Sequence, residues 1–139
     1  MKTIKEAFQE FLNEQKLIMS PRTCRDYDEL ISLFEEYLDE CAPDDLYEED
    51  KILHDEKQKN EGKKYCQIFD LAYIAPYDIE YLLEDYLIND VGASATFVET
   101  SRRFFRKFLP WALEKGYVDP EHYSELADVV GGLKGKKFE

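Results

Sequence analysis

Apolar side chains recur every three or four residues along most of this chain, and the longest such run constrains the fold most. It extends from Tyr27 to Cys41 with acidic residues between the apolar ones, as in an amphipathic helix. Ser20 and Pro21 precede it, and this pair indicates a helix start because serine caps free amides and proline fits the first turn. Pro43 predicts the end of the helix. Since no stretch alternates with the period of a β-strand, the sequence predicts an all-α protein.

Other segments carry helical periodicity or start signals of the same kind. Residues 65–74 are apolar but short, and their secondary structure stays open. We expect four to five main helices in one domain over residues 1–130, followed by a flexible tail or the start of a linker over 131–139. The further helices are predicted over residues 3–16, from Pro76 to a break at 91–93, from about 95 to 115 behind a Ser94 cap, and from Asp119-Pro120 to about Val130.

Charge is distributed unevenly along the 139 residues, whose net charge is −13. Residues 26–61 hold three lysines against fifteen acidic residues, whereas 1–25 and 91–118 are mildly basic, at +2 and +3. We interpret residues 44–64, which are polar and acidic, as an insertion. A short amphipathic helix can form there from Leu46, Tyr47, Ile52 and Leu53. The residues from His54 to Lys64 are then an exposed helix end or a mobile loop. The stretch 44–61 is a solvated segment, a docking surface for a basic protein, or a mimic of nucleic-acid charge.

Several classes of protein are disfavoured by the residue pattern. No run of about 18 apolar residues and no leader segment occurs, so we expect a cytoplasmic protein without a membrane partner. Cys24, Cys41 and Cys66 are widely spaced and are expected to be buried rather than disulfide-bonded. His54 and His122 lack the neighbours of a metal site, so we expect no metal, and no motif of the sequence calls for a cofactor.

Four cations fall on one arc of the helix predicted over residues 95–115, opposite its phenylalanines. Such an arc is either the solvated face of an amphipathic helix or a phosphate-binding face. Near the start of the second helix, Arg22 and Arg25 either pair with Asp26, Asp28 or Glu29, or face a partner. The four cations of the arc are Arg102, Arg103, Arg106 and Lys107.

Three segments, taken in order, resemble the core-binding, SAM-like N-terminal domain of phage integrases and other tyrosine recombinases. They are Ser20-Pro-Arg-Thr followed by Tyr27 and its apolar stripe, Ile74-Ala-Pro-Tyr-Asp-Ile-Glu-Tyr-Leu82, and Ser94-Ala-Thr96 continuing through Arg102-Arg-Phe-Phe-Arg-Lys-Phe108 to Gly116. The resemblance implies a SAM-like orthogonal helix bundle that grips duplex DNA through its second and fourth helices. It implies DNA contacts by Arg22, Thr23, Arg25, Thr96, Arg102, Arg103 and Arg106, to which Lys107 is added because it lies on the same arc.

Two features depart from that family. Its catalytic residues include a His-x-x-Arg motif, but Lys57 and Glu125 stand three residues after the two histidines, so no strand cleavage is expected. The acidic insertion is also foreign to the family's usually short connection. The leading hypothesis is therefore a non-catalytic DNA-binding module. The alternative is a protein-interaction module of the same fold that uses its acidic surface, and a third reading is a domain separated from its catalytic part.

Overall fold

The computed structural model describes residues 1–137 and is built from helices, with no β-strand among them. The prediction of an all-α protein is confirmed. Among the described residues seven α-helices form, of which five have twelve residues or more, and the segment 65–74 that the sequence left open holds a short helix and a 3₁₀ turn. The helices are α1 (Ile4–Gln15), α2 (Pro21–Cys41), α3 (Glu48–Glu61), α4 (Tyr65–Ile68), α5 (Pro76–Tyr81), α6 (Ala95–Glu114) and α7 (Pro120–Lys137), with 3₁₀ turns at Ala42–Asp45 and Leu71–Tyr73 and a π-helix, η3, at Leu82–Asp90.

The predicted helix starts at Ser20 and Ser94 are confirmed. The Ser20 hydroxyl accepts a hydrogen bond from the Thr23 amide at 3.2 Å, and the Ser94 hydroxyl accepts one from the Phe97 amide at 3.1 Å. These bonds satisfy amides that have no partner inside the helix. At the first helix, Thr3 and Glu6 form a reciprocal capping box.

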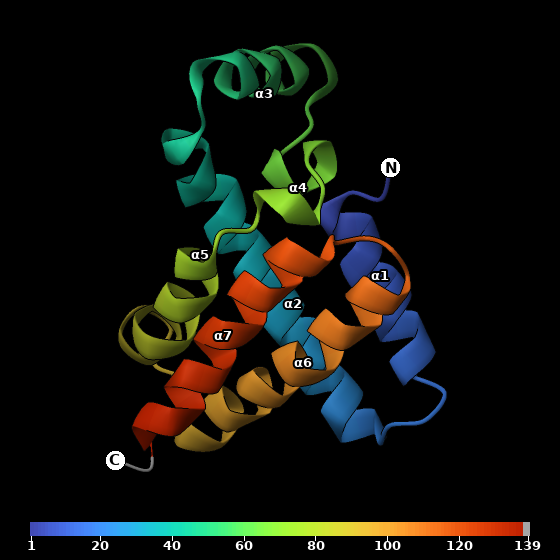
Figure 1. The fold of residues 1–139 in the computed structure, drawn as a ribbon, viewed down its shortest axis with the longest axis vertical. Helices are drawn as coiled ribbons and strands as arrows, with labels where there is room; N and C mark the ends of the chain where they lie inside the picture. Colours follow the sequence, from blue (N-terminus) through green and yellow to red (C-terminus); the bar gives the residue numbers. More distant parts are fainter. Residues whose placement is uncertain (138–139) are drawn as a thin grey trace.

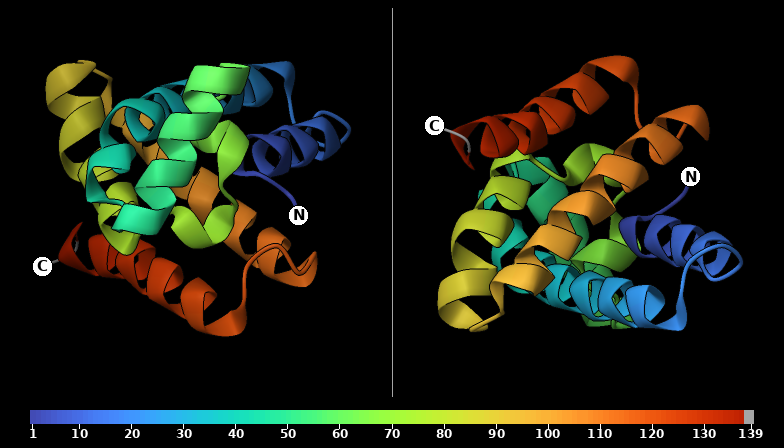
Figure 2. Two further views of the ribbon diagram at one scale, coloured as in Figure 1. Left: turned by 90° about the horizontal axis from the view of Figure 1, so that it is seen from above. Right: turned by 90° about the horizontal axis from the view of Figure 1, so that it is seen from below.

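Helices α1, α2 and α6 enclose an aromatic core (Figure 1). Phe104 of α6 lies at its centre, with ring centroids 5.5 Å from Phe11, 5.2 Å from Tyr27 and 6.0 Å from Phe8. Helix α7 covers another side of α6 and also packs on α5, as the view from below shows (Figure 2). The apolar stripes read from the sequence therefore face one shared core.

Helix α3 lies at one end of the long axis of the molecule, above the bundle (Figure 1). It runs unbroken to Glu61 and ends at Gly62, whose φ of 67° is the left-handed conformation that glycine adopts easily. The predicted apolar face is wrong in detail, because Ile52 and Leu53 are exposed whereas His54 is buried against the Tyr65 ring. Tertiary contact with α4 thus decides which face of α3 turns inward.

Two other segments differ from the sequence prediction. The helix begun at Pro76 changes at Leu82 into a π-helix, and Leu82, Leu83 and Leu87 are buried, on the side that α-helical spacing also predicts. The segment 131–137, expected to be part of a flexible tail, continues α7 as helix beyond Val130. Val130 is buried in the core, so packing supports the helix where its glycines do not. Residues 138–139 of the expected tail lie outside the described residues.

Each helix within the described residues is either too short or too polar to cross a membrane. Cys24 and Cys66 are buried, as expected, and Cys41 is exposed at the end of α2, contrary to expectation. Cys41 is the last residue of its helix, where the chain turns into the 3₁₀ segment at Ala42 and the apolar stripe leaves the core.

Candidate functional site

The start of α2 meets the middle of α6 on one side of the bundle. Tyr27 packs edge-on against Phe104, and the Lys107 amine lies 3.8 Å from the sulfur of Met19, the residue before the Ser20 cap. Arg103 lies near Tyr27, whose pKa is raised by burial and lowered to a smaller degree by this guanidinium. Arg103 and Lys107 of α6 therefore lie beside the start of α2, the helix that also carries Arg22 and Arg25.

We use the name basic edge for Arg22, Thr23 and Arg25 at the start of α2 together with Arg103 and Lys107 of the neighbouring α6. The four cations form no ion pair with any described side chain, and apart from the half-buried Thr23 the residues are exposed. Of the two alternatives for Arg22 and Arg25, ion pairing with acids of their own helix is not seen among the described residues. The Thr23 hydroxyl accepts a hydrogen bond from Ser20, at 3.0 Å.

Arg102 and Arg106 do not belong to the basic edge. Glu99 lies 2.9 Å from the Arg102 guanidinium and 3.8 Å from that of Arg106, and the side chain of Arg102 is only 16% exposed. The carboxylate compensates part of their charge, so these two arginines are poorly placed for phosphate. The sequence places Glu99 three residues before Arg102 and four before Arg103, so spacing shows that Glu99 can pair with an arginine but not with which one.

Thr96 is exposed in the first turn of α6. Its position is seven residues before Arg103 and eleven before Lys107, so the three share one stripe of the helix. Seven residues correspond to about 10 Å of helix rise, so Thr96 extends the stripe away from the start of α2.

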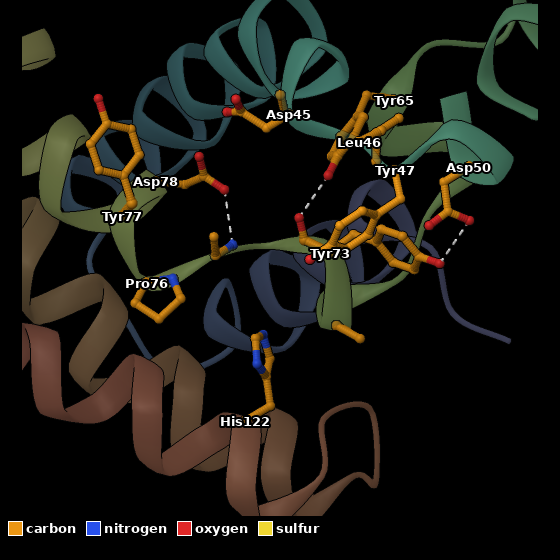
Figure 3. Close-up of a pocket in the computed structure, with 13 residues that line it drawn as sticks. Asp45, Leu46, Tyr47, Asp50, Tyr65, Tyr73, Pro76, Tyr77, Asp78 and His122 are labelled. Carbon is orange, nitrogen blue, oxygen red and sulfur yellow. Dashed lines mark hydrogen bonds between the residues drawn. The ribbon is translucent and has the colours of Figure 1, made fainter. Parts of the chain in front are cut away.

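A second feature is a cleft of about 740 Å³ between α3, α5 and α7 (Figure 3). Among the described residues, four tyrosines and three aspartates line it, and no lysine or arginine does. His122 enters from α7 with its Nε2 2.8 Å from the Ile74 carbonyl, to which it must donate. The sequence analysis missed this arrangement because its residues come from separate segments. The tyrosines are Tyr47, Tyr65, Tyr73 and Tyr77, and the aspartates are Asp45, Asp50 and Asp78.

Two partly or fully buried carboxyl groups carry raised pKa values. Burial raises the pKa of Glu35, although Lys5 lies 3.3 Å from it and opposes the shift, and burial likewise raises the pKa of Asp78. A carboxyl whose pKa is higher in the folded than in the unfolded protein stabilises the fold below the ordinary carboxyl pKa. It loses that contribution as the pH rises through the folded-state value.

We therefore expect the melting temperature at low salt to rise by a few degrees as the pH is lowered from 7 to about 5. Reduced repulsion within a chain of net charge −13 acts in the same direction. The matched variants Glu35→Gln and Glu36→Gln separate the two effects, since Glu36 is exposed on the same helix. Calorimetry should show a smaller pH dependence for Glu35→Gln than for Glu36→Gln. Equal pH dependence in the two variants would contradict the assignment to Glu35.

Metal chemistry finds no support in the described side chains, because no group of three His, Cys, Asp or Glu residues among them lies close enough to hold an ion. Comparison of the chain with protein-family models, with curated proteins and with solved structures found no match.

Proposed function

We propose that the protein is a non-catalytic, SAM-like module that binds duplex DNA through the basic edge. The observation that carries this proposal is that α2 and α6, which pack together, expose four cations that form no ion pair within residues 1–137, with Lys107 beside the capped start of α2. Phosphate is bound by arginine, lysine, hydroxyl groups and the amides of a helix start, all of which are present there. The ordered resemblance of three segments to the recombinase core-binding domain supports the same reading.

The distribution of charge supports DNA as the partner in spite of the net charge. Helix α3, which starts with three acidic residues, lies at the opposite end of the long axis from the start of α2 (Figure 1). A Debye length of about 8–10 Å screens such distant exposed charges at physiological salt. The basic edge is therefore governed mainly by its own cations and by the nearer acids of α2, such as Asp26 and Asp28.

Binding of this kind depends steeply on salt. If all four cations of the basic edge contact phosphates, the logarithm of the association constant should fall by about 3.6 for each tenfold rise in salt. We expect weak binding without sequence preference, with a Kd in the range of about 10⁻⁶–10⁻⁴ M at physiological salt and tighter binding at about 50 mM salt.

Fluorescence anisotropy with a labelled duplex of about 20 base pairs tests the proposal. The double variants Arg22→Ala/Arg25→Ala and Arg103→Ala/Lys107→Ala should each lower the affinity at about 50 mM salt by roughly tenfold and reduce the salt slope by about half. Arg102 and Arg106 are avoided because they are partly buried and paired with Glu99.

The control is Lys51→Ala/Lys59→Ala on α3, which removes the same charge from two exposed positions. It should change DNA affinity by less than about twofold, since these lysines lie far from the basic edge. Absence of DNA binding by the unaltered protein, or an equal loss in the control and the edge variants, would contradict the proposal.

The alternative is a protein-interaction module that uses the acidic surface and has no affinity for DNA. The cleft beneath α3 favours an interaction with a cationic group, because three aspartates line it without a lysine or arginine. The two functions use different surfaces, so the DNA titration and a peptide titration distinguish them.

A further inference from the structure

The cleft between α3, α5 and α7 combines aromatic walls with uncompensated negative charge (Figure 3). We propose that it binds the guanidinium or ammonium group of an arginine or lysine side chain, presented by a basic segment of a partner protein. This site is separate from the basic edge and does not depend on DNA binding.

The carboxylates differ in what they offer a ligand. Asp78 already accepts hydrogen bonds from the Tyr37 hydroxyl at 3.2 Å and the Ala75 amide at 2.9 Å, and Asp50 accepts one from the Tyr73 hydroxyl at 3.2 Å. Asp45 is exposed and has no hydrogen bond or ion pair with any described residue. Asp45 is therefore the carboxylate free to pair with an entering cation, and the other two add negative potential around it.

The hydrogen-bonding groups that remain free in the cleft wall also favour a ligand that donates hydrogen bonds. The Tyr65 hydroxyl donates to the Tyr73 carbonyl at 2.7 Å, and the Tyr73 hydroxyl donates to Asp50, so both hydroxyl protons are engaged and only lone pairs remain. His122 uses its Nε2 proton on the Ile74 carbonyl, so this proton is not available to a ligand. Guanidinium and ammonium groups have only donors, so they complement a wall that consists mostly of acceptors.

The tyrosine rings supply the second part of the recognition. Tyr47 is 87% exposed at the cleft, and Tyr77 is 58% exposed although its ring stacks on that of Tyr81. A cation over the face of such a ring is attracted by the ring quadrupole, and more strongly once water is displaced. Arginine also stacks its planar group on a tyrosine ring.

The size of the cleft favours a peptide segment over an isolated side chain. Its volume of about 740 Å³ lies within the range of clefts that hold ligands of drug size, larger than one arginine side chain. Helix α3, which begins beside Tyr47, also exposes Ile52 and Leu53, apolar side chains that a longer segment can cover. The site therefore fits a side chain whose flanking residues lie across the rim.

Anisotropy of a fluorescein-labelled peptide with alternating arginine and serine tests the proposal at about 150 mM salt. The full chain should bind it with a Kd in the micromolar range. A peptide with citrulline in place of arginine keeps the shape without the charge and should bind at least tenfold more weakly. Competition by N-acetylarginine amide should require millimolar concentrations if the flanking residues of the segment contribute. Competition by that compound at micromolar concentrations would overturn the assignment of a peptide segment as the occupant.

Matched variants locate the binding site. Asp45→Asn should weaken binding at least fivefold, whereas Asp44→Asn, which removes the same charge from the exposed neighbour outside the cleft, should change it by less than twofold. Tyr47→Leu keeps apolar bulk without an aromatic face and should weaken binding about threefold or more. The DNA-edge variant Arg103→Ala/Lys107→Ala should leave peptide binding within twofold. Equal effects of the two aspartate variants, or equal affinity for the citrulline peptide, would overturn the proposal.

Discussion

Replacing Phe104 by alanine is expected to lower the free energy of unfolding by about 3–5 kcal/mol. Phe104 is 1% exposed and contacts aromatic rings of three helices, among them Phe8, Phe11 and Tyr27. Alanine removes the ring but leaves α1, α2 and α6 in place, so the loss of transfer free energy is joined by the cost of a cavity between them. Urea denaturation followed by circular dichroism measures the change.

Two controls separate packing from the loss of an aromatic side chain as such. Phe104→Leu retains most of the buried volume and should cost clearly less than the alanine variant. Tyr47→Ala removes a ring that is 87% exposed and should change stability by less than about 0.5 kcal/mol. A Phe104→Ala protein that lost less than about 1 kcal/mol would show that this ring is not the centre of the core.

The helices that the sequence predicted well are those whose start signals lie within a few residues of the first turn. At Ser20-Pro21 and Ser94, the cap, the proline or the following apolar stripe lie within a few residues, and the physical interactions that they form are equally local. The inward faces of α2 and α6 followed from periodicity alone, because each stripe is long enough to define one side of a helix.

The mispredicted elements depend on contacts between distant segments. His54 is turned inward by α4, and α7 continues past Val130 along α5 and α6, so neither outcome is encoded in its own neighbourhood. The π-helix after Tyr81 keeps three leucines in the core that an α-helix would also bury, and no local residue distinguishes the two. Tertiary packing overrides local propensity in each case.

The candidate sites show the same division. The cations of α6 were found from their spacing, but only the structure separates Arg103 and Lys107 from the two arginines paired with Glu99. The cleft could not be found from spacing, because Tyr47, Tyr77 and His122 are brought together from three helices or their ends. A net charge of −13 thus conceals two surfaces of opposite character, and each calls for its own binding experiment.

Replacing Asp78 by alanine is expected to cost about 2–4 kcal/mol of stability, somewhat less than the loss of the Phe104 ring. The buried carboxylate accepts from the Ala75 amide at the start of α5 and from the Tyr37 hydroxyl of α2, joining helices that are far apart in the sequence. Alanine leaves the buried Tyr37 hydroxyl desolvated without this acceptor and removes the cap of the Ala75 amide at the start of α5.

The conservative variant and a neighbouring aspartate make this prediction specific. Asp78→Asn keeps an acceptor and removes a charge whose burial raises the carboxyl pKa, so its cost should be below about 1.5 kcal/mol near pH 7. Asp45→Ala, which removes an exposed carboxylate from the same cleft, should have almost no effect. If the Asp78→Ala and Asp45→Ala proteins unfolded at the same urea concentration at pH 7, the bridging role of Asp78 would be contradicted. If Asp78→Ala and Asp78→Asn had equal urea midpoints, the role of the Asp78 hydrogen bonds would be contradicted.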